Sequence, residues 1–114
     1  MSAVPEVDDV LQRLAALISA RHGEPAGQSY TKQLLEAGVE RCARKLAEES
    51  TETIIAALGT DKSALTREAA DLLYHLLVLL ESRHVSLDDV LRELRARMGT
   101  SGLAEKAARR GTSS

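Results

Sequence analysis

Residues 45–71 read KLAEESTETIIAALGTDKSALTREAAD, and the acidic residues in this stretch predict how the chain folds. Two pairs of carboxylates, each pair spaced three residues apart, flank the turn-forming residues 59–61: Glu49 with Glu52, and Glu68 with Asp71. Residues three apart are neighbours on a helix surface, so each pair would share one helix face. A helical hairpin at this turn would bring Glu49 level with Asp71 and Glu52 level with Glu68. Packed helices lie about 8–10 Å apart, so the four carboxylates would surround a space suited to a divalent cation.

The composition favours an all-α protein with a single domain. The chain has 114 residues, and its 44% hydrophobic content contains only two aromatic residues, Tyr30 and Tyr74. Ala- and Leu-rich usage with only two prolines favours helices over strands. The apolar spacing predicts five helices, at about residues 5–21, 29–38, 39–58, 61–83 and 86–97. We assign an all-α domain to residues 1–98 and a small, polar C-terminal tail to residues 99–114.

The fourth of these helices predicts that the protein is not a monomer. Residues 72–80 read LLYHLLVLL, which is apolar nearly all round the helix. A helix of this kind needs apolar partners on every side. A chain this short has few elements to supply them, so we expect a homodimer, or a higher homo-oligomer, in which a second copy completes the helical bundle.

Charge and cysteine content exclude several classes of function. The net charge of −2 gives no reason to expect a nucleic-acid partner. The single cysteine, Cys42, forms no internal disulfide, and no Cys/His spacing suggests a zinc site. The N-terminus lacks the layout of a signal peptide, and residues 72–80 are too few to span a bilayer. We therefore expect a cytoplasmic protein without a membrane partner.

The acidic residues of the hairpin have an ordinary explanation and a chemical one. Solvent-exposed glutamates on a helix surface are common, and that explanation stays open. Against it, like charges at helical spacing repel, and Glu68 and Asp71 directly precede the most apolar stretch of the chain. Carboxylates without His or Cys select Mg²⁺ or Mn²⁺ over zinc or copper. A di-iron site would need Glu-x-x-His pairs on two helices, and the chain has only Glu81 with His84.

Magnesium held by carboxylates usually works on phosphate substrates, which need cations nearby. Lys45 shares a helix face with Glu49 and Glu52, so it is the stronger candidate for a phosphate contact, and Lys32 is a weaker one. The hairpin would place Lys45 level with His75. We interpret His75 as a core residue with one hydrogen bond rather than as a catalytic group.

The sequence resembles the phosphoribosyl-ATP pyrophosphatase family, which belongs to the MazG-type all-α nucleoside-triphosphate pyrophosphohydrolases. The superfamily pattern E-E-x-x-E followed by E-x-x-D is present at residues 48–52 and 68–71. The narrower resemblance rests on SYT at 29–31, on Lys45 three residues before the double Glu, on DLLYHLLVLL at 71–80 and on the tail GTSGLAEKA. The family often has Gly before the double Glu, where this chain has Ala47.

The resemblance implies hydrolysis of 1-(5-phospho-β-D-ribosyl)-ATP to phosphoribosyl-AMP and pyrophosphate, the second step of histidine biosynthesis. It implies that Mg²⁺ is held by four carboxylates, that Glu48 activates water or supports the site, and that Lys45 and, with less support, Lys32 contact phosphate. The four metal ligands would be Glu49, Glu52, Glu68 and Asp71. Two alternatives stay open: a housekeeping MazG-type enzyme acting on free nucleotides, and a helical interaction module without catalysis.

Overall fold

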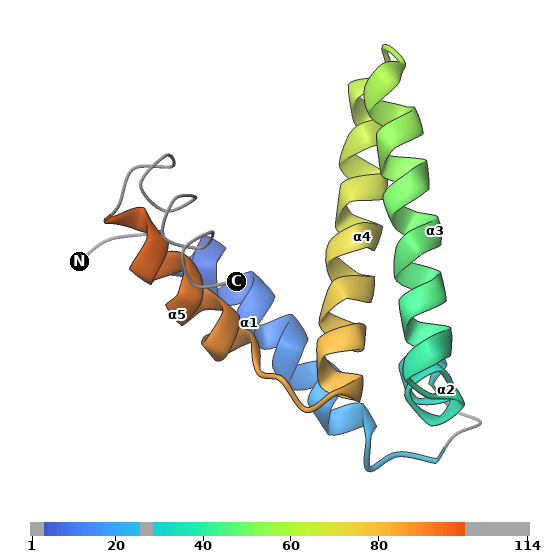
Figure 1. Cartoon of the computed structure of the whole chain (residues 1–114), viewed down its shortest axis with the longest axis vertical. Helices are drawn as coiled ribbons and strands as arrows, with labels where there is room; N and C mark the ends of the chain where they lie inside the picture. The colour runs from blue at the N-terminus through green and yellow to red at the C-terminus, as the bar shows by residue number, and fades with distance from the viewer. Residues whose placement is uncertain (1–3, 26–28, 100–114) are drawn as a thin grey trace, which may run out of the picture.

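An antiparallel pair of long helices is the central element of the fold (Figure 1). The computed structural model describes residues 4–25 and 29–99, which form five helices and no strand, so the predicted all-α class is confirmed. The tail predicted from residue 99 onward lies outside the described residues, apart from Gly99. The helices are α1 (Val4–Arg21), α2 (Tyr30–Ala37), α3 (Val39–Leu58), α4 (Lys62–Ser82) and α5 (Leu87–Met98).

The hairpin turns where the sequence predicts, because its two helix ends are capped there. The backbone N–H of Gly59 donates to the carbonyl of Ala56 and closes the last turn of α3. The Asp61 carboxylate accepts hydrogen bonds from the backbone N–H groups of Ser63 and Ala64, at 2.9 and 3.2 Å. This satisfies two of the N–H groups that a helix N-terminus leaves without intrahelical partners. The short capped turn therefore sets the level at which α3 and α4 face each other.

Helix α2 crosses the base of the hairpin and is held there by side chains from both long helices (Figure 1). The buried Cys42 thiol of α3 donates to the carbonyl of Leu34, at 3.3 Å. The Tyr74 hydroxyl of α4 is hydrogen-bonded to the buried Thr31 hydroxyl. Gly38 joins α2 to α3 with φ of 101°, a conformation that strains any residue with a Cβ. These contacts fix the lower end of the hairpin.

The apolar core is small and lies at the same end of the hairpin. Its fully buried members come from the first four helices: Ile18, Leu34, Leu35, Cys42, Leu77 and Val78. Helix α1 joins this core near its C-terminus, and α1 and α5 form an arm that diverges from the hairpin in Figure 1. The radius of gyration is 16.7 Å, larger than the roughly 13 Å typical of a compact domain of about 100 residues. The fold is therefore open, and none of the other helices in residues 4–25 and 29–99 packs on the upper half of the hairpin.

Several large apolar side chains outside this core are exposed to solvent. Ile54, Ile55 and Leu58, at the upper end of α3, are 60%, 64% and 83% exposed. Leu73 and Leu76 of the apolar stretch in α4 are also partly exposed, while Leu77 and Val78 are buried. None of the described helices combines the length and the hydropathy that a membrane crossing requires.

Removing the Asp61 cap is expected to destabilise the hairpin. Asp61→Ala should lower the free energy of unfolding by about 1 kcal/mol, because two N–H groups of α4 lose their acceptor. Urea unfolding followed by circular dichroism measures this change. Thr60→Ala, at the exposed neighbouring position, is the control and should change stability by less than about 0.5 kcal/mol. Equal stability of Asp61→Ala and wild type would contradict the role of the cap.

Candidate metal centre

Three carboxylates from the two hairpin helices meet at one level. Glu49 of α3 and Glu68 and Asp71 of α4 each place an oxygen within 4.8 Å of the others. Two of them come from one face of α4, as the spacing of three residues predicts. The sequence therefore predicted correctly which helices approach each other and at which turn. We call these three residues the carboxylate cluster.

The carboxylate cluster is partly removed from water. Glu49 is only 8% exposed, and Glu68 is half-buried. The Oε1 atom of Glu68 is inaccessible to solvent and has no hydrogen-bond partner among the residues that the structure describes. A polar atom that is removed from water without a partner destabilises the fold, and more so when it is charged. A positive charge beside this oxygen would give it a partner.

The surroundings of Glu68 raise the pKa of its carboxyl. Desolvation by burial is the largest cause that raises the pKa of its carboxyl above the ordinary value, followed by the charge and hydrogen bonding of Glu52. The charges of Asp71 and Glu49 raise it further. Each cause makes the negative form of Glu68 less favourable than it would be in water. A cation bound between the carboxylates would act in the opposite direction.

Glu52 lies beside the carboxylate cluster but not within it. Its carboxylate is exposed, and it is not among the three groups that share the 4.8 Å spacing. Its charge nevertheless affects Glu68, which places the two side chains near each other as the hairpin predicts. Glu52 as a fourth metal ligand therefore stays a prediction.

The donor set of the cluster fits a divalent cation. All its atoms are carboxylate oxygens, the ligands that hard cations such as Mg²⁺, Mn²⁺ and Ca²⁺ prefer. One cation would supply the missing partner of Glu68 Oε1 and relieve the repulsion that raises the pKa of that carboxyl. The residues present therefore fit a metal ion that binds between α3 and α4.

A lysine stands next to the cluster, as predicted, and carries an ion pair. Lys45 precedes Glu49 by one turn of α3, and its Nζ atom lies 3.2 Å from Glu48 Oε1. The hydrogen bond that Lys45 donates to Glu48 is the largest cause that raises the pKa of Lys45, and the Glu49 charge also contributes. The lysine is thus held in its charged form beside the carboxylates. The predicted roles of Lys45 in phosphate binding and of Glu48 in catalysis involve two side chains that already contact each other.

Lys32 makes contacts away from this pair. Its ammonium donates to the backbone carbonyl of His22, and it lies 3.7 Å from Glu36 Oε2. The contact with His22 joins α2 to the segment that follows α1, and the contact with Glu36 lies within α2. The described structure gives Lys32 a structural partner, and its predicted contact with phosphate stays a prediction.

His75 is buried and makes one hydrogen bond, which agrees with its interpretation as a core residue. Its Nδ1 lies 2.9 Å from the carbonyl oxygen of Asp71. A carbonyl oxygen can only accept, so Nδ1 carries the proton. The ring packs edge-on against Tyr74 and Tyr30, with centroid distances of 4.8 and 6.3 Å. His75 therefore contacts the backbone of Asp71, one of the cluster residues.

Thr53 contacts the backbone of two cluster residues, and the sequence pattern did not identify it. The Thr53 hydroxyl contacts the main-chain carbonyls of both Glu49 and Glu68, at 2.7 and 3.1 Å. The available signal is the position of Thr53 four residues after Glu49, where a threonine hydroxyl reaches the preceding turn. The second contact, across the helices, depends on the tertiary structure.

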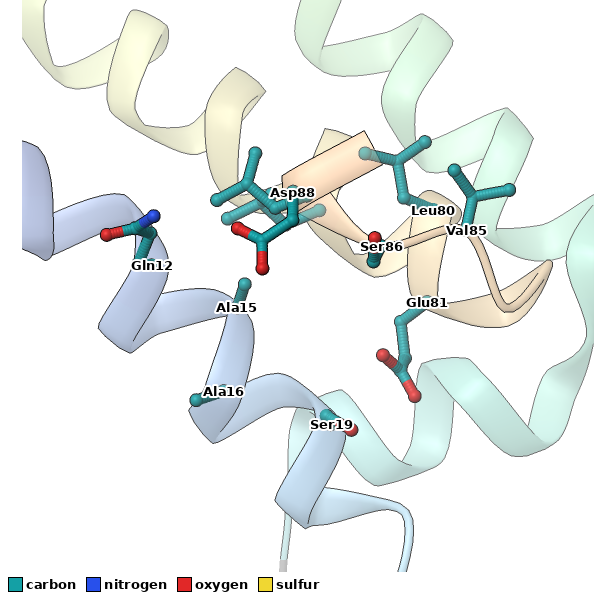
Figure 2. Close-up of a pocket in the computed structure, with 11 residues that line it drawn as sticks. Gln12, Ala15, Ala16, Ser19, Leu80, Glu81, Val85, Ser86 and Asp88 are labelled. Atoms are coloured by element: carbon teal, nitrogen blue, oxygen red, sulfur yellow. The ribbon is translucent and has the colours of Figure 1, made fainter. Parts of the chain in front are cut away.

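A separate cavity of about 320 Å³ lies between α1, α4 and the start of α5 (Figure 2). Figure 2 shows Glu81 of α4, Ser19 of α1 and Asp88 of α5 around it. Glu81 is also 2.7 Å from the Nδ1 atom of His22. None of the cluster residues lines this cavity. The cavity and the candidate metal centre are therefore distinct.

Comparison with known proteins decides the family. Residues 11–98 match the family described as phosphoribosyl-ATP pyrophosphohydrolase. The chain belongs to this family. The matched region contains the whole hairpin, including the carboxylate cluster and its lysine. The resemblance found in the sequence is therefore confirmed, and the chain is an enzyme of this hydrolase family.

Individual relatives agree over nearly their whole length. A protein of Rhodobacter capsulatus named phosphoribosyl-ATP pyrophosphatase is 56% identical over 99 residues, which is 87% of this chain and 96% of that protein. A protein of Jannaschia sp. with the same name is 56% identical, covering 87% of this chain and 97% of its own. A third, from Ruegeria pomeroyi, is 53% identical, covering 88% and 95%. The family acts on a small nucleotide substrate.

Neutralising Glu68 is expected to stabilise the metal-free protein at neutral pH. The raised pKa of Glu68 means that its contribution to stability is present below the ordinary glutamate pKa of about 4.3 and is lost as pH rises through the raised value. Glu68→Gln should therefore unfold at a higher temperature than wild type at pH 7 in EDTA. The difference should shrink below about pH 4, where wild-type Glu68 is protonated.

Thermal unfolding at several pH values measures this difference. Glu40→Gln, at an exposed position of α3 outside the cluster, is the matched control and should not raise stability. Added Mg²⁺ should stabilise wild type and have little effect on Glu68→Gln. A Glu68→Gln protein that is less stable than wild type at pH 7 in EDTA would contradict the repulsion within the cluster.

Proposed function

We propose that the protein hydrolyses 1-(5-phospho-β-D-ribosyl)-ATP, with Mg²⁺, to 1-(5-phosphoribosyl)-AMP and pyrophosphate. The observation that carries this proposal is the carboxylate cluster, which lies inside the region that matches the phosphoribosyl-ATP pyrophosphohydrolase family. Relatives with more than half of their residues identical to this chain carry the name of this activity. The reaction is the second step of histidine biosynthesis, and we expect a cytoplasmic enzyme.

The proposed reaction breaks the bond between the α and β phosphates. A water molecule attacks phosphorus, a new P–O bond forms, and pyrophosphate leaves with the electrons of the broken bond. The protein must bring the water into line with this bond and balance the negative charge of the triphosphate. The hairpin supplies groups for both tasks.

In this proposal Glu49, Glu68 and Asp71 hold Mg²⁺, and Glu52 joins them when substrate is bound. Magnesium neutralises phosphate charge and lowers the pKa of water. The partly buried position of Glu49 and Glu68 excludes much of the solvent from this side of the triphosphate. The raised pKa of Glu68 means that its carboxyl holds a proton more readily than an ordinary glutamate, and a cation held by these residues would favour the ionised form.

Lys45 and Glu48 then act as a pair that substrate separates. The Lys45 ammonium is drawn to a phosphate oxygen, which frees the exposed Glu48 carboxylate to accept the proton of the attacking water. Lys45 stays in its charged form, because its carboxylate neighbours raise its pKa. Lys32 has a secondary place in this proposal, since its ammonium is directed to His22.

Two other functions differ in what they predict. A housekeeping MazG-type enzyme would use the same carboxylates on a free nucleotide such as dCTP or dUTP. A helical interaction module without catalysis would bind neither metal nor nucleotide. The family match and the names of the relatives favour phosphoribosyl-ATP over both.

Turnover of the candidate substrates distinguishes these functions. With Mg²⁺ present, we expect phosphoribosyl-ATP to be hydrolysed at least about a hundredfold faster, in kcat/KM, than dCTP or dUTP, since specificity lies in differential transition-state binding. Pyrophosphate release measures the rate, and chelation by EDTA should abolish it. Faster hydrolysis of a free deoxynucleotide would favour the housekeeping function instead.

The variant Glu52→Gln tests the fourth carboxylate in the same assay. It should lose nearly all activity and keep the helical fold, because Glu52 is exposed and supports no core contact. Circular dichroism checks the fold. Near-normal activity of this variant would remove Glu52 from the metal site while leaving the carboxylate cluster in place.

We also propose that the protein is a homodimer in which a second copy covers the upper part of the hairpin. Ile54, Ile55 and Leu58 are largely exposed there, although each is a large apolar residue. Contiguous exposed apolar side chains on a small protein are typical of association surfaces. The partial exposure of Leu73 and Leu76 supports the expectation that one copy cannot cover its own α4.

Sedimentation velocity tests the dimer. Wild type should sediment at twice the 12.3 kDa of the single chain, and Ile55→Asp should shift it toward the monomer, because a charge would be buried in the interface. Ala57→Asp, an exposed small residue of the same helix turn, is the control for a new charge near the end of α3. A wild-type monomer at micromolar concentration would contradict the proposal.

A further inference from the structure

One hydroxyl group contacts the main chains of two residues of the carboxylate cluster. Thr53 Oγ1 lies 2.7 Å from the carbonyl oxygen of Glu49, in its own helix, and 3.1 Å from the carbonyl oxygen of Glu68, in the opposite helix. Both carbonyls only accept, so the single hydroxyl proton is shared between them in a three-centre arrangement or alternates between them. Thr53 is therefore a direct link between α3 and α4 at the level of the cluster.

Other threonines in the hairpin lack such a link. The Thr51 hydroxyl donates to Ala47, at 3.1 Å, and the Thr66 hydroxyl to Lys62, at 2.9 Å. Both bonds stay within one helix, and both groups are exposed. The bond of Thr53 to its own helix is thus ordinary for a helical threonine. The contact with Glu68 is the feature that calls for an explanation.

The two contacted carbonyls belong to the residues whose carboxylates must converge. The positions of the Glu49 and Glu68 side chains depend on how closely α3 and α4 approach and on their relative level. A metal ligand has to be held within about 0.5 Å of its productive position. A cross-helix hydrogen bond from the Thr53 hydroxyl to the main-chain carbonyl of Glu68 restricts both the separation and the sliding of the helices.

We propose that Thr53 is a positioning residue for the metal centre, which acts by fixing the main chains of Glu49 and Glu68 relative to each other. Thr53 supplies no ligand to the ion and acts only through these two residues. This inference rests on the proposed function, because it assumes that the carboxylate cluster binds a divalent cation. It goes further by assigning the geometry of that site to a hydroxyl outside the acidic motif.

The hydroxyl can be removed without changing the shape of the side chain. Valine has the same β-branched form as threonine and carries a methyl group in place of the hydroxyl, so it can neither donate nor accept a hydrogen bond. In Thr53→Val both carbonyls would keep their places in the helices, but the hydrogen bond across the helices would be lost. Thr53→Ser keeps the hydroxyl and removes the methyl group. The two variants therefore separate the hydrogen bond from the packing.

The test measures Mn²⁺ binding to the whole protein by electron paramagnetic resonance, without substrate. We expect Thr53→Val to raise the dissociation constant about tenfold, as is typical when a group that orients a metal ligand is lost. Thr53→Ser and the matched control Thr51→Val should stay within about twofold of wild type. In steady-state assays, Thr53→Val should need about tenfold more Mg²⁺ for half-maximal rate and regain most of its kcat when Mg²⁺ is saturating.

Two results would overturn this inference, and each contradicts a different part of it. Unchanged Mn²⁺ binding by Thr53→Val would remove the positioning role and leave the metal centre intact. Absence of Mn²⁺ binding by wild type would overturn the metal centre itself, and the role of Thr53 with it. Should Thr53→Val not fold, the pair Thr53→Ser and Thr53→Ala gives the same comparison, because these two differ only in the hydroxyl. Equal binding by that pair would equally contradict the proposal.

Discussion

The repulsion among three carboxylates within 4.8 Å of one another is the constraint on which the structure depends. Such a cluster opposes folding, because burial and, to a lesser degree, the neighbouring carboxylates raise the pKa of Glu68 and so disfavour its charged form. The hairpin keeps the carboxylates together because contacts elsewhere outweigh the repulsion. These are the capped turn at Asp61, the Thr53 link and the buried core at the base. The ligands are thus held close together before a cation arrives.

The same hairpin explains why the chain is open. Its lower half is covered by α1 and α2, where Ile18, Leu34 and Val78 are buried. Its upper half carries Ile54, Ile55 and Leu58, which no other helix that the structure describes covers. The cluster lies on this long two-helix element rather than inside a closed core. In the proposed function a phosphate substrate approaches it from solvent, and in the proposed dimer a second copy of the chain packs on the exposed apolar side chains.

Much of the fold could be predicted from local sequence signals. Gly59 and Asp61 mark the turn, and both end their helices there in the structure. The spacing of the acids predicted the meeting of Glu49 with Glu68 and Asp71 because helical period and hairpin level are local geometry. Local signals did not predict that Glu52 is exposed or that Lys32 contacts His22. Both depend on how side chains pack between helices.

The sequence by itself determined the helices, their caps, the family and the residue types available to hold a cation. Each of these follows from residues close together in the chain, whose hydrogen bonds and helical period act over a few positions. Only the tertiary structure decided that one Glu68 oxygen is buried without a described partner and that one Thr53 hydroxyl joins two cluster residues. Both facts depend on the separation of α3 and α4. That distance is set by packing over the whole hairpin, which no local pattern records.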